Sequence, residues 1–381
     1  MSQIIYPFRP SVLSPEQFGL KAANLSRMAH AGLRVPAALA VKVAHAMKPL
    51  RELDDAAHHV HSIAVETHEF AKQAWAATVS VRSSPTRSMP GMLRTALGVP
   101  SSFLSHRDAV ASVVASVEAP HVKQWARITG TDVEQGILAQ EMVHTAVPGD
   151  LVGVFEVRPS GLTGEFVPHR TTGVPPDAVV SGRERPAPAD GMNETAWRVV
   201  EPLLDGVLDV FQEPTEVELV VSGGVAYALQ ARPVAKGVVA KHPELEREAD
   251  HRGLGVSRGF GEGVIVWGEP QAKAALAEDL PYVLAADYTT PDDLGVIAAA
   301  SAVVTLEGGY HSHAATVCRQ LGVPAVAGVD VARLPIRAAD DSRGFLGVDG
   351  TRGLVYELSR ADAVGRMFAV PEMIRVSDLE S

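Results

Sequence analysis

Cysteine is almost absent from this chain of 381 residues, and its scarcity excludes one class of protein. Cys318 is the sole cysteine in the sequence, so no internal disulfide framework can form. Small secreted domains rely on such frameworks, whereas free thiols are typical of the reducing cytoplasm. We therefore expect a cytoplasmic protein.

Long apolar runs are absent too. No uninterrupted apolar stretch of the sequence approaches the roughly 20 residues that span a bilayer. Residues 1–10 lack the basic stretch and the apolar core that make a secretory signal. These absences predict that the protein has neither a secretory leader nor a membrane partner.

Positive charge is also in short supply. The 34 lysines and arginines are outnumbered by 45 acidic residues, which gives a net charge of −11 at pH 7. Nucleic-acid binding requires a basic surface that neutralises phosphates, so we expect no nucleic-acid partner. A small phosphorylated ligand is compatible with this charge, because it needs only a few local cations.

The length of the chain favours two domains over one. The stretch 233–255 is polar and charged and contains Pro233 and Pro243, a composition typical of a linker. We therefore predict a mixed α/β (α+β) protein with a first domain at 1–235, a linker at 236–255, a second domain at 256–368 and a C-terminal tail at 369–381.

Local patterns predict several elements within these domains. Ser14 and Pro15 indicate the start of a helical stretch that ends near Gly32. Helical periodicity covers 107–128, and strand patterns cover 78–82, 151–157 and 216–231, the last of which turns at Gly223-Gly224. Residues 168–190 have the composition of an exposed loop. After the linker we expect short strands, one helix from about 313 to 321 and a closing hairpin over 345–357.

Residues 305–328 combine a glycine turn, a helix start and a histidine. Gly308-Gly309 permits a tight turn, and Ser312 is a suitable N-cap for a helix that begins at His313. The N-terminus of a helix favours anions by about 0.3–1 kcal/mol, and a phosphoryl group on imidazole is a dianion. The pattern therefore suits a histidine that carries a phosphoryl group as a covalent intermediate. A histidine that only caps or packs is the alternative.

This stretch resembles the phosphohistidine domain of the phosphoenolpyruvate-utilising enzymes, the family of pyruvate phosphate dikinase, phosphoenolpyruvate synthase and rifampin phosphotransferase. The family pattern is a Gly-Gly turn, two residues, Ser or Cys, then His-Ala-Ala, a helix with a basic residue, and Leu-Gly-x-Pro-Ala-Val-x-Gly. The chain matches it with Gly308-Gly309, Ser312 to Ala315, Arg319, Leu321 to Val326, and Gly328. Residues 288–293 resemble the family's Thr-Ser/Thr-Pro-Asp/Glu-Asp segment. One position departs, because His311 stands where the family usually has threonine.

The resemblance implies a swivelling β/β/α domain in which His313 is the catalytic nucleophile. In the family's chemistry the histidine attacks the β-phosphorus of ATP and AMP leaves. Inorganic phosphate or water then removes the terminal phosphoryl group, and the remaining phosphohistidine serves an acceptor. The change at His311 could alter how that acceptor is handled.

A phosphohistidine needs a donor, and the first domain contains residues suited to a polyphosphate. Positive charge for a triphosphate comes from Lys21, Arg82 and Arg232. Oxygen ligands for Mg²⁺ come from Glu218 and Gln230, which we expect to project from the same face of two paired strands. Taken singly, each of these fragments is more typical of a solvated charge or a surface ion pair.

In their order along the chain, these fragments resemble the N-terminal ATP-grasp domain of pyruvate phosphate dikinase. The resemblance implies that ATP is the substrate and that Mg²⁺ is bound by Glu218 and Gln230. It assigns Gln140 and Met142 to an adenine hinge. The remaining residues that it assigns are the ATP contacts Lys21, Arg82, Glu218, Gln230 and Arg232, and a phosphate loop that contains Ser88, Met89, Gly91 and Met92.

The dikinase continues into a TIM barrel that binds phosphoenolpyruvate and pyruvate, whereas this sequence ends soon after Tyr356. We therefore expect an AMP-forming phosphotransferase whose acceptor is an unidentified small molecule or a separate acceptor-domain protein. One alternative is the ATP/phosphate half of a split dikinase that acts with a barrel subunit. Another is a degenerate, non-catalytic binding or regulatory homologue. His58, His59 and His61 are more typical of a polar helix face than of a metal site.

Overall fold

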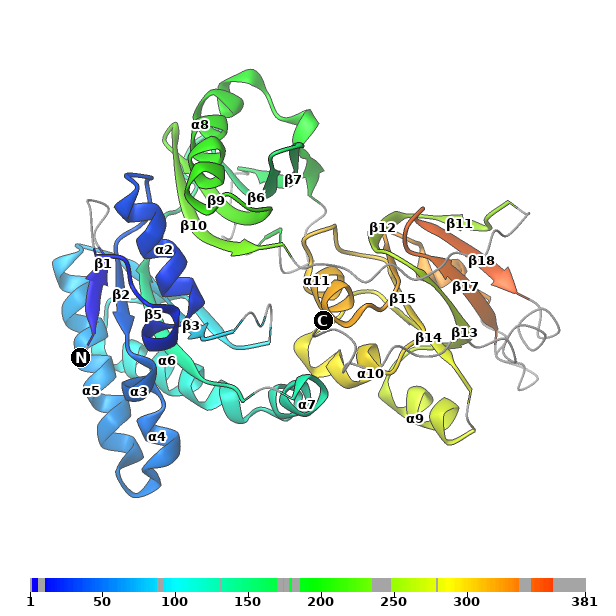
Figure 1. Ribbon diagram of the computed structural model, residues 1–381, viewed down its shortest axis with the longest axis horizontal. Helices are drawn as coiled ribbons and strands as arrows, with labels where there is room; N and C mark the ends of the chain where they lie inside the picture. Colours follow the sequence, from blue (N-terminus) through cyan, green and yellow to red (C-terminus); the bar gives the residue numbers. More distant parts are fainter. Residues whose placement is uncertain are drawn as a thin grey trace. The chain divides into compact units, whose positions relative to one another are not determined.

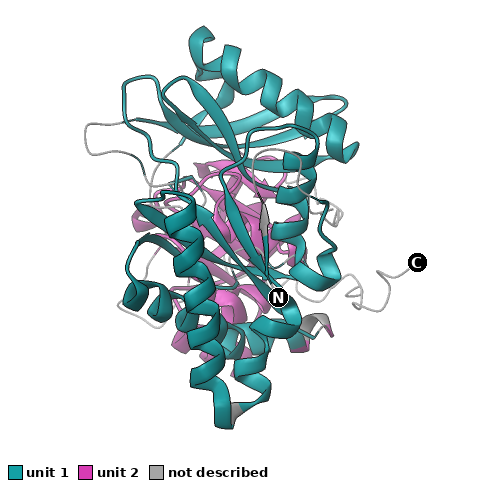
Figure 2. Ribbon diagram, turned by 90° about the vertical axis from the view of Figure 1, so that its left-hand side faces the viewer, with its two compact units in different colours: residues 1–126, 131–179, 186–234 teal, residues 127–130, 180–185, 235–381 magenta. Residues whose placement is uncertain are grey.

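The computed structural model describes residues 2–5, 11–87, 89, 92–130, 132–169, 174, 178–179, 186–234, 248–278, 280–335 and 344–358. Two compact units divide the chain (Figure 2). The first contains the described residues up to Val234 except 127–130, and the second contains 127–130 and the described residues from 248 onward. Helices and three sheets make up these units, which confirms a mixed α/β protein (Figure 1).

Sheet A of the first unit is antiparallel, with strand order β1-β2-β5-β3-β4. Its strands are β1 (Gln3–Ile5), β2 (Ala38–Val41), β3 (Thr78–Pro85), β4 (Thr95–Pro100) and β5 (Gln135–Glu141). The helices of this part of the chain are α3 (Val43–Ala46), α4 (Lys48–Arg51), α5 (Ala56–Gln73), α6 (Phe103–Ala115) and α7 (Pro120–Thr129), of which residues 127–129 belong to the second unit. Ile63 and Phe70 of α5 pack with Val110 of α6 and the strand residues in one apolar core. The predicted helical region at 107–128 is therefore two helices, separated at Pro120, which suits a first helical turn.

Sheet B of the first unit is also antiparallel, with strand order β10-β9-β6-β7-β8. Its strands are β6 (Leu151–Arg158), β7 (Gly161–Pro168), β8 (Ala187–Pro188), β9 (Thr215–Ser222) and β10 (Val225–Pro233). One face packs against α8 (Glu194–Phe211) and α2 (Leu20–His30) in a second apolar core. Alternation along β9 sends Val217 and Leu219 into this core and leaves Glu216 and Glu218 on the other face.

The N-terminal helical stretch begins as predicted but contains a break. Ser14 caps α1 (Pro15–Phe18) by accepting a hydrogen bond from the Gln17 amide, and α2 starts after Gly19. Leu25, Met28 and Ala29 are buried along α2, as the predicted apolar face requires.

The second unit contains an eight-stranded sheet with strand order β11-β18-β17-β13-β14-β15-β16-β12. Its strands are β11 (His251–Arg252), β12 (Leu254–Ser257), β13 (Phe260–Val266), β14 (Tyr282–Ala286), β15 (Ala302–Thr305), β16 (Ala325–Ala327), β17 (Phe345–Asp349) and β18 (Leu354–Leu358). The neighbours β13, β14, β15 and β16 run parallel, and the other pairs are antiparallel. Its helices are α9 (Glu269–Ala277), α10 (Leu294–Ala298) and α11 (His313–Leu321). The helix and the closing hairpin predicted for this region are confirmed.

Part of the predicted linker is ordered as sheet. Residues 251–252 pair with β18, and β12 begins at Leu254 and pairs with β16. The sheet of the second unit therefore starts inside the predicted range 236–255. The pattern gave no sign of this, because β11 has only two residues, both polar, and only the first two residues of β12 fall within the range. Residues 235–247, the predicted tail at 369–381 and most of the predicted loop at 168–190 lie outside the described residues.

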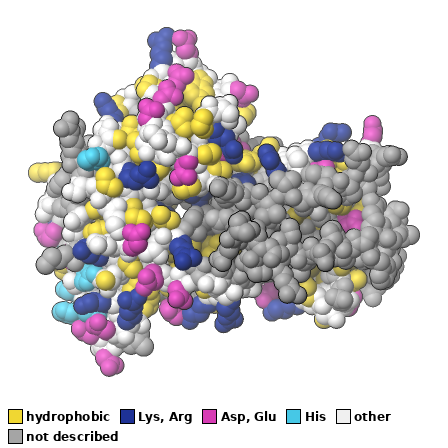
Figure 3. Space-filling model, in the orientation of Figure 1, with side chains coloured by type: hydrophobic (Ala, Val, Ile, Leu, Met, Phe, Trp, Pro, Cys, Tyr) yellow, Lys and Arg dark blue, Asp and Glu magenta, His cyan; other side chains and the backbone are white. Residues whose placement is uncertain are grey.

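On the face drawn in Figure 3, acidic and basic side chains are interspersed over the described surface. No helix in the described ranges is long and apolar enough to cross a membrane.

Candidate functional site

A close contact between Gly19 and Ser84 fixes the start of α2 against the end of β3. Gly19 has φ +80°, and a Cβ atom on it would lie 1.7 Å from the Ser84 carbonyl oxygen. The Ser84 hydroxyl accepts a hydrogen bond of 3.1 Å from the Ala22 amide. Only glycine permits this approach, and it places Lys21, in the first turn of α2, beside the strand that carries Arg82.

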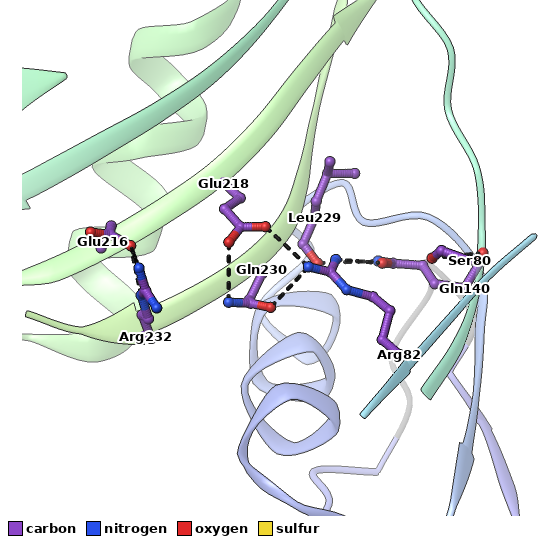
Figure 4. Close-up of polar contacts among 8 residues, drawn as sticks. All are labelled: Ser80, Arg82, Gln140, Glu216, Glu218, Leu229, Gln230 and Arg232. Carbon is purple, nitrogen blue, oxygen red and sulfur yellow. Dashed lines mark hydrogen bonds and ion pairs between the residues drawn. The ribbon is translucent and has the colours of Figure 1, made fainter. Parts of the chain in front are cut away.

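Arg82 is the centre of a network that joins the two sheets of the first unit (Figure 4). Its Nη2 donates to Glu218 Oε2 and to Gln230 Oε1, both at 3.1 Å. Its Nη1 donates to Gln140 Oε1 at 3.4 Å. The side chains of Arg82 and Glu218 are only 12% and 15% exposed, so this ion pair is shielded from water.

Glu218 and Gln230 face each other across β9 and β10, as the sequence predicts. They are direct partners in the strand register, and Gln230 Nε2 donates to Glu218 Oε1 at 3.3 Å. A register shift between Ala228 and Gln230 creates this pairing, because a bulge at Leu229 adds one residue to β10. Without the bulge Leu229 would stand opposite Glu218, so the bulge brings the two polar side chains together.

Arg232 lies on the same face and pairs with a residue that the sequence patterns did not assign to the site. Its Nε donates to Glu216 Oε1 at 2.6 Å, and its Nη2 contacts the same oxygen. Glu216 is 5% exposed, so the pair is nearly buried. Glu156 of β6 stands opposite Glu216 in the register and pairs with Arg158. The Glu-x-Glu spacing of β9 is the signal that could have identified Glu216.

Lys21 titrates in the neutral range. Loss of hydration on burial and the charge of Arg82 lower the pKa of its ammonium group to about 7, with a smaller contribution from Arg232. The Glu218 carboxylate opposes this shift. An anion with several charges would restore the proton of Lys21, because it would outweigh the neighbouring guanidinium groups.

The two residues assigned to the adenine hinge lie at the end of β5. Gln140 is buried, and its Nε2 donates to the Leu229 carbonyl at 3.2 Å while its Oε1 accepts from Arg82. Met142 follows the strand, and its amide donates to the Thr78 carbonyl. Gln140 therefore bridges sheet A to the bulge of sheet B. The sequence contains no local signal for that contact.

The predicted phosphate loop is described at Met89 and Met92 only, since Ser88 and Gly91 lie outside the described residues. Both methionine side chains are buried. The Met92 carbonyl lies 2.9 Å from Nε2 of His121. These two residues are therefore anchored by packing.

His313 is the first residue of α11 and is half-buried. Ser312 is the N-cap, and its hydroxyl accepts a hydrogen bond of 3.4 Å from the Ala315 amide. The preceding turn uses Gly308 at φ +106°. Gly322, at φ +69° and in the left-handed conformation, ends the helix. The cap and both helix ends match the sequence prediction.

Arg319 ties the turn before His313 to the rest of the second unit. Its Nη1 donates to the Tyr310 carbonyl at 2.5 Å and to the Val256 carbonyl at 3.0 Å. Its guanidinium also stacks on the Tyr310 ring at 4.3 Å from the centroid. The His311 ring meets the Tyr310 ring edge-on at 5.3 Å. The histidine that departs from the family pattern is thus buried within this stack.

The segment at 288–293 lies at the same edge of the sheet as this turn. The parallel strands β14 and β15 end there, and the Glu307 amide donates to the Asp287 carbonyl at 2.8 Å. Thr290 and Asp293 form a capping box at the start of the next helical turn. Both segments that resemble the family therefore meet at the carboxyl ends of parallel strands, the edge at which α/β sheets commonly bind ligands.

Comparison with known proteins finds a family match over this part of the chain. A family model described as the mobile domain of the PEP-utilising enzymes matches residues 279–353. These residues are therefore similar to the mobile domain of that family. The match to the mobile domain covers β14, β15 and α11, and with them His313.

Relatives with longer chains are similar to part of this one. The probable phosphoenolpyruvate synthase of Archaeoglobus fulgidus is 35% identical over 158 residues, which are 39% of this chain and 20% of the relative. The pyruvate, phosphate dikinase of Rhizobium meliloti is 35% identical over 95 residues, 25% of this chain and 11% of the relative. A solved structure, the N-terminal domain of Enzyme 1 - Nitrogen, is 27% identical, covers 23% of this chain and 36% of its own, and has a TM-score of 0.18. The alignments to these two curated relatives therefore span a fifth of their length or less.

Two histidines of α5 have partners that account for them. His59 lies 2.8 Å from a Glu52 carboxylate oxygen, and the His61 ring packs against Phe103. Within the described ranges, no group of three or more histidine, cysteine or acidic side chains is arranged to hold a metal ion.

Proposed function

We propose that this chain is an ATP-dependent phosphotransferase in which His313 accepts a phosphoryl group. The observation that supports this most is the position of His313 as the first residue of α11 within the family's mobile domain. Backbone N–H groups in the first turn of a helix attract anions. A dianionic phosphoryl group on the imidazole would be stabilised at that position.

For the first unit we propose an ATP-grasp nucleotide site that binds the triphosphate through Lys21, Arg82 and Arg232. Phosphoryl transfer depends on cations that neutralise charge on the phosphate oxygens. The Nε of Arg82 is buried and has no hydrogen-bond partner among the described residues, so it can donate to a phosphate oxygen. Gln140 and Met142 remain our candidates for the adenine contact.

The donor set of Glu218 and Gln230 fits a magnesium ion. Their side-chain oxygens face one another and both already accept a hydrogen bond from one cationic group. Mg²⁺ is commonly held by one or two carboxylates together with substrate phosphates. When bound, the ion would neutralise phosphate charge, and ATP would supply the ligands that the protein does not.

The proposed chemistry has two steps on His313. The imidazole nitrogen forms a bond to the β-phosphorus of ATP, the bond from that phosphorus to the α–β bridging oxygen breaks, and AMP leaves with the electron pair. Inorganic phosphate or water then attacks the terminal phosphorus and releases pyrophosphate or phosphate. The second unit must bring His313 to the nucleotide for the first step to occur.

For the acceptor we propose a small molecule or a domain on a separate chain. The names of the relatives, phosphoenolpyruvate synthase and pyruvate, phosphate dikinase, favour a split dikinase as the second candidate. The presence of all five proposed phosphate and metal contacts together with His313 argues against a degenerate binding homologue. These five contacts are Lys21, Arg82, Glu218, Gln230 and Arg232.

The test is the fate of ATP labelled at the β-phosphorus. We expect AMP as the nucleotide product and an acid-labile, base-stable label on the protein. The label should be lost in His313→Ala and retained in His311→Ala. ADP as the sole early product, or a label that survives in His313→Ala, would overturn the proposal.

An assay with pyruvate tests whether the acceptor site lies on a separate chain. Sustained phosphoenolpyruvate formation by the isolated chain with Mg·ATP, phosphate and pyruvate would contradict the need for a separate acceptor. A labelled enzyme that stalls until a barrel protein is added would identify the split dikinase.

A further inference from the structure

We propose that Arg82 keeps the Glu218–Gln230 pair closed to free divalent cations and opens it only when a polyphosphate arrives with the metal. The inference rests on the proposed nucleotide site and names its substrate, the metal–nucleotide complex taken as one unit.

The geometry that carries this inference is the placement of one guanidinium nitrogen. Arg82 Nη2 lies 3.1 Å from Glu218 Oε2 and 3.1 Å from Gln230 Oε1, so it occupies the space between the two candidate ligands (Figure 4). A cation that both side chains ligate must lie in that space. Metal and guanidinium therefore compete for the same two residues.

The competition favours Arg82 because the pair is shielded. Arg82 and Glu218 are 12% and 15% exposed, and Gln230 is 7% exposed. A charge-assisted hydrogen bond in such surroundings is strong, and breaking it leaves a charge without a partner in a poorly solvated place. A free metal ion must meet this cost and lose part of its own hydration shell as well.

The local charge opposes a lone dication further. Arg82 and Arg232 are balanced by Glu218 and Glu216, with which they pair. Lys21, in the first turn of α2, adds a further positive charge when it is protonated. Mg²⁺ alone would leave the cluster with a large positive excess.

A triphosphate removes both obstacles to metal binding, the loss of the Arg82 hydrogen bonds and the excess of positive charge. Its oxygens offer the guanidinium a new acceptor of matching planar geometry, and its negative charge cancels that of the metal. The third contact of Arg82, from Nη1 to Gln140, involves no proposed metal ligand. Gln140 is held by the Leu229 carbonyl, so Arg82 keeps one acceptor while Nη2 is released.

The test measures Mn²⁺ binding by electron paramagnetic resonance, with Mn²⁺ as the probe for the magnesium site. The wild-type chain should bind Mn²⁺ weakly alone and at least about ten-fold more tightly with α,β-methylene-ATP, in which the bond to be cleaved is blocked. Arg82→Met should bind Mn²⁺ alone at least about ten-fold more tightly than the wild type. Equal wild-type affinity with and without the analogue would overturn the inference.

Two further variants locate the effect. Arg198→Met removes an exposed arginine of α8 that pairs with Glu194, and it should bind Mn²⁺ as the wild type does. Arg82→Met combined with Glu218→Gln should lose the gained affinity. A gain that persists in the double variant, or no gain in an Arg82→Met protein with a wild-type melting temperature, would contradict the proposal. If Arg82→Met does not fold, the wild-type affinity for Mn²⁺ with and without α,β-methylene-ATP tests the proposal by itself.

Mn²⁺ binding and labelling of His313 distinguish a failure of this inference from a failure of the proposed function. Nucleotide-dependent Mn²⁺ binding without labelling of His313 would remove the proposed reaction and support the role of Arg82. Labelling of His313 together with Mn²⁺ binding that ignores the nucleotide would preserve the reaction and remove that role.

Discussion

The two candidate sites of this chain are built in opposite ways. The Arg82 network gathers side chains from β3, β5, β9 and β10, which are separated by up to 148 residues in sequence. The turn at His313 is assembled mainly from residues 308–319, through a helix cap, a stacked arginine and backbone hydrogen bonds. The first site depends on strand register and on the contact of two sheets, whereas the second depends on local chain geometry. Substitutions should therefore damage the two sites by different routes.

The largest expected loss of stability comes from the contact that anchors α2. Gly19→Ala should lower the free energy of unfolding of the first unit by about 3 kcal/mol, because the new methyl group overlaps the Ser84 carbonyl and the residue is held at positive φ. Thermal or urea unfolding would measure this.

Gly32→Ala is the matched control for that change. Gly32 follows the other end of α2 at φ +84°, and a Cβ atom on it would meet no neighbouring atom within 4 Å. The substitution should therefore cost only about 1 kcal/mol of backbone strain. Equal losses for the two variants would show that the Gly19–Ser84 contact does not anchor α2.

The next effect separates function from stability within the Arg82 network. Glu218→Gln should lower the use of Mg·ATP by about 10- to 100-fold, because it removes the charge of a proposed metal ligand and keeps its shape. Initial rates of AMP formation at varied Mg²⁺ would measure it. Glutamine can still accept the hydrogen bond from Arg82 but no longer balances its charge, so the melting temperature should fall moderately. A collapse of the melting temperature would mean that Glu218 serves mainly the fold.

The pH dependence of nucleotide binding tests Lys21. Its pKa of about 7 in the free protein should rise when a triphosphate binds. Below pH 7 Lys21 is already charged, so affinity should be flat there. Above pH 7 binding must take up a proton, and affinity should fall by up to about ten-fold per pH unit until the raised pKa is reached.

Calorimetry in buffers of different ionisation enthalpy would count the protons taken up. Lys21→Met supplies the baseline, because ATP itself titrates near this range and does so in both proteins. Identical proton uptake by the two proteins would contradict the assignment of Lys21.

The smallest effect compares two helix caps. Ser14→Ala and Ser312→Ala each remove a side-chain hydrogen bond to a helix N-terminus, and each should cost about 1 kcal/mol of stability. Only Ser312→Ala should also slow the labelling of His313, since its cap fixes the first turn that carries the histidine. If Ser14→Ala slowed the labelling of His313 as much as Ser312→Ala does, this role of the Ser312 cap would be contradicted.

The contrast between the sites also explains what could be predicted from the sequence. The bounds of α11 follow from Ser312 and Gly322, which lie beside the residues that they control. The Gly223-Gly224 turn is likewise a local signal, and it predicts that β9 and β10 pair. The structure confirms the helix bounds and the hairpin, whereas the pairing of Glu218 with Gln230 depends on the bulge, because the turn alone would place Leu229 opposite Glu218.

The contacts between distant residues gave no such signal. Gln140 reaches the Leu229 carbonyl across 89 residues, and Ser84 receives the Ala22 amide across 62. A backbone carbonyl as partner leaves no trace in residue type, and a bulge cannot be recognised without the strand opposite. The sequence does not predict β11, because a strand of two residues shows no periodicity.

The bulge at Leu229 determines what a one-residue deletion in β10 would change. Ala228 pairs with Leu219 and Gln230 pairs with Glu218, so deleting Leu229 would leave a regular ladder in which Gln230 and Arg232 still share a face with Glu218 and Glu216. The deletion would instead remove the carbonyl that accepts the hydrogen bond from Gln140. An alignment with a gap at Leu229 would therefore show every charged group in place while the bridge from sheet A to sheet B had been lost.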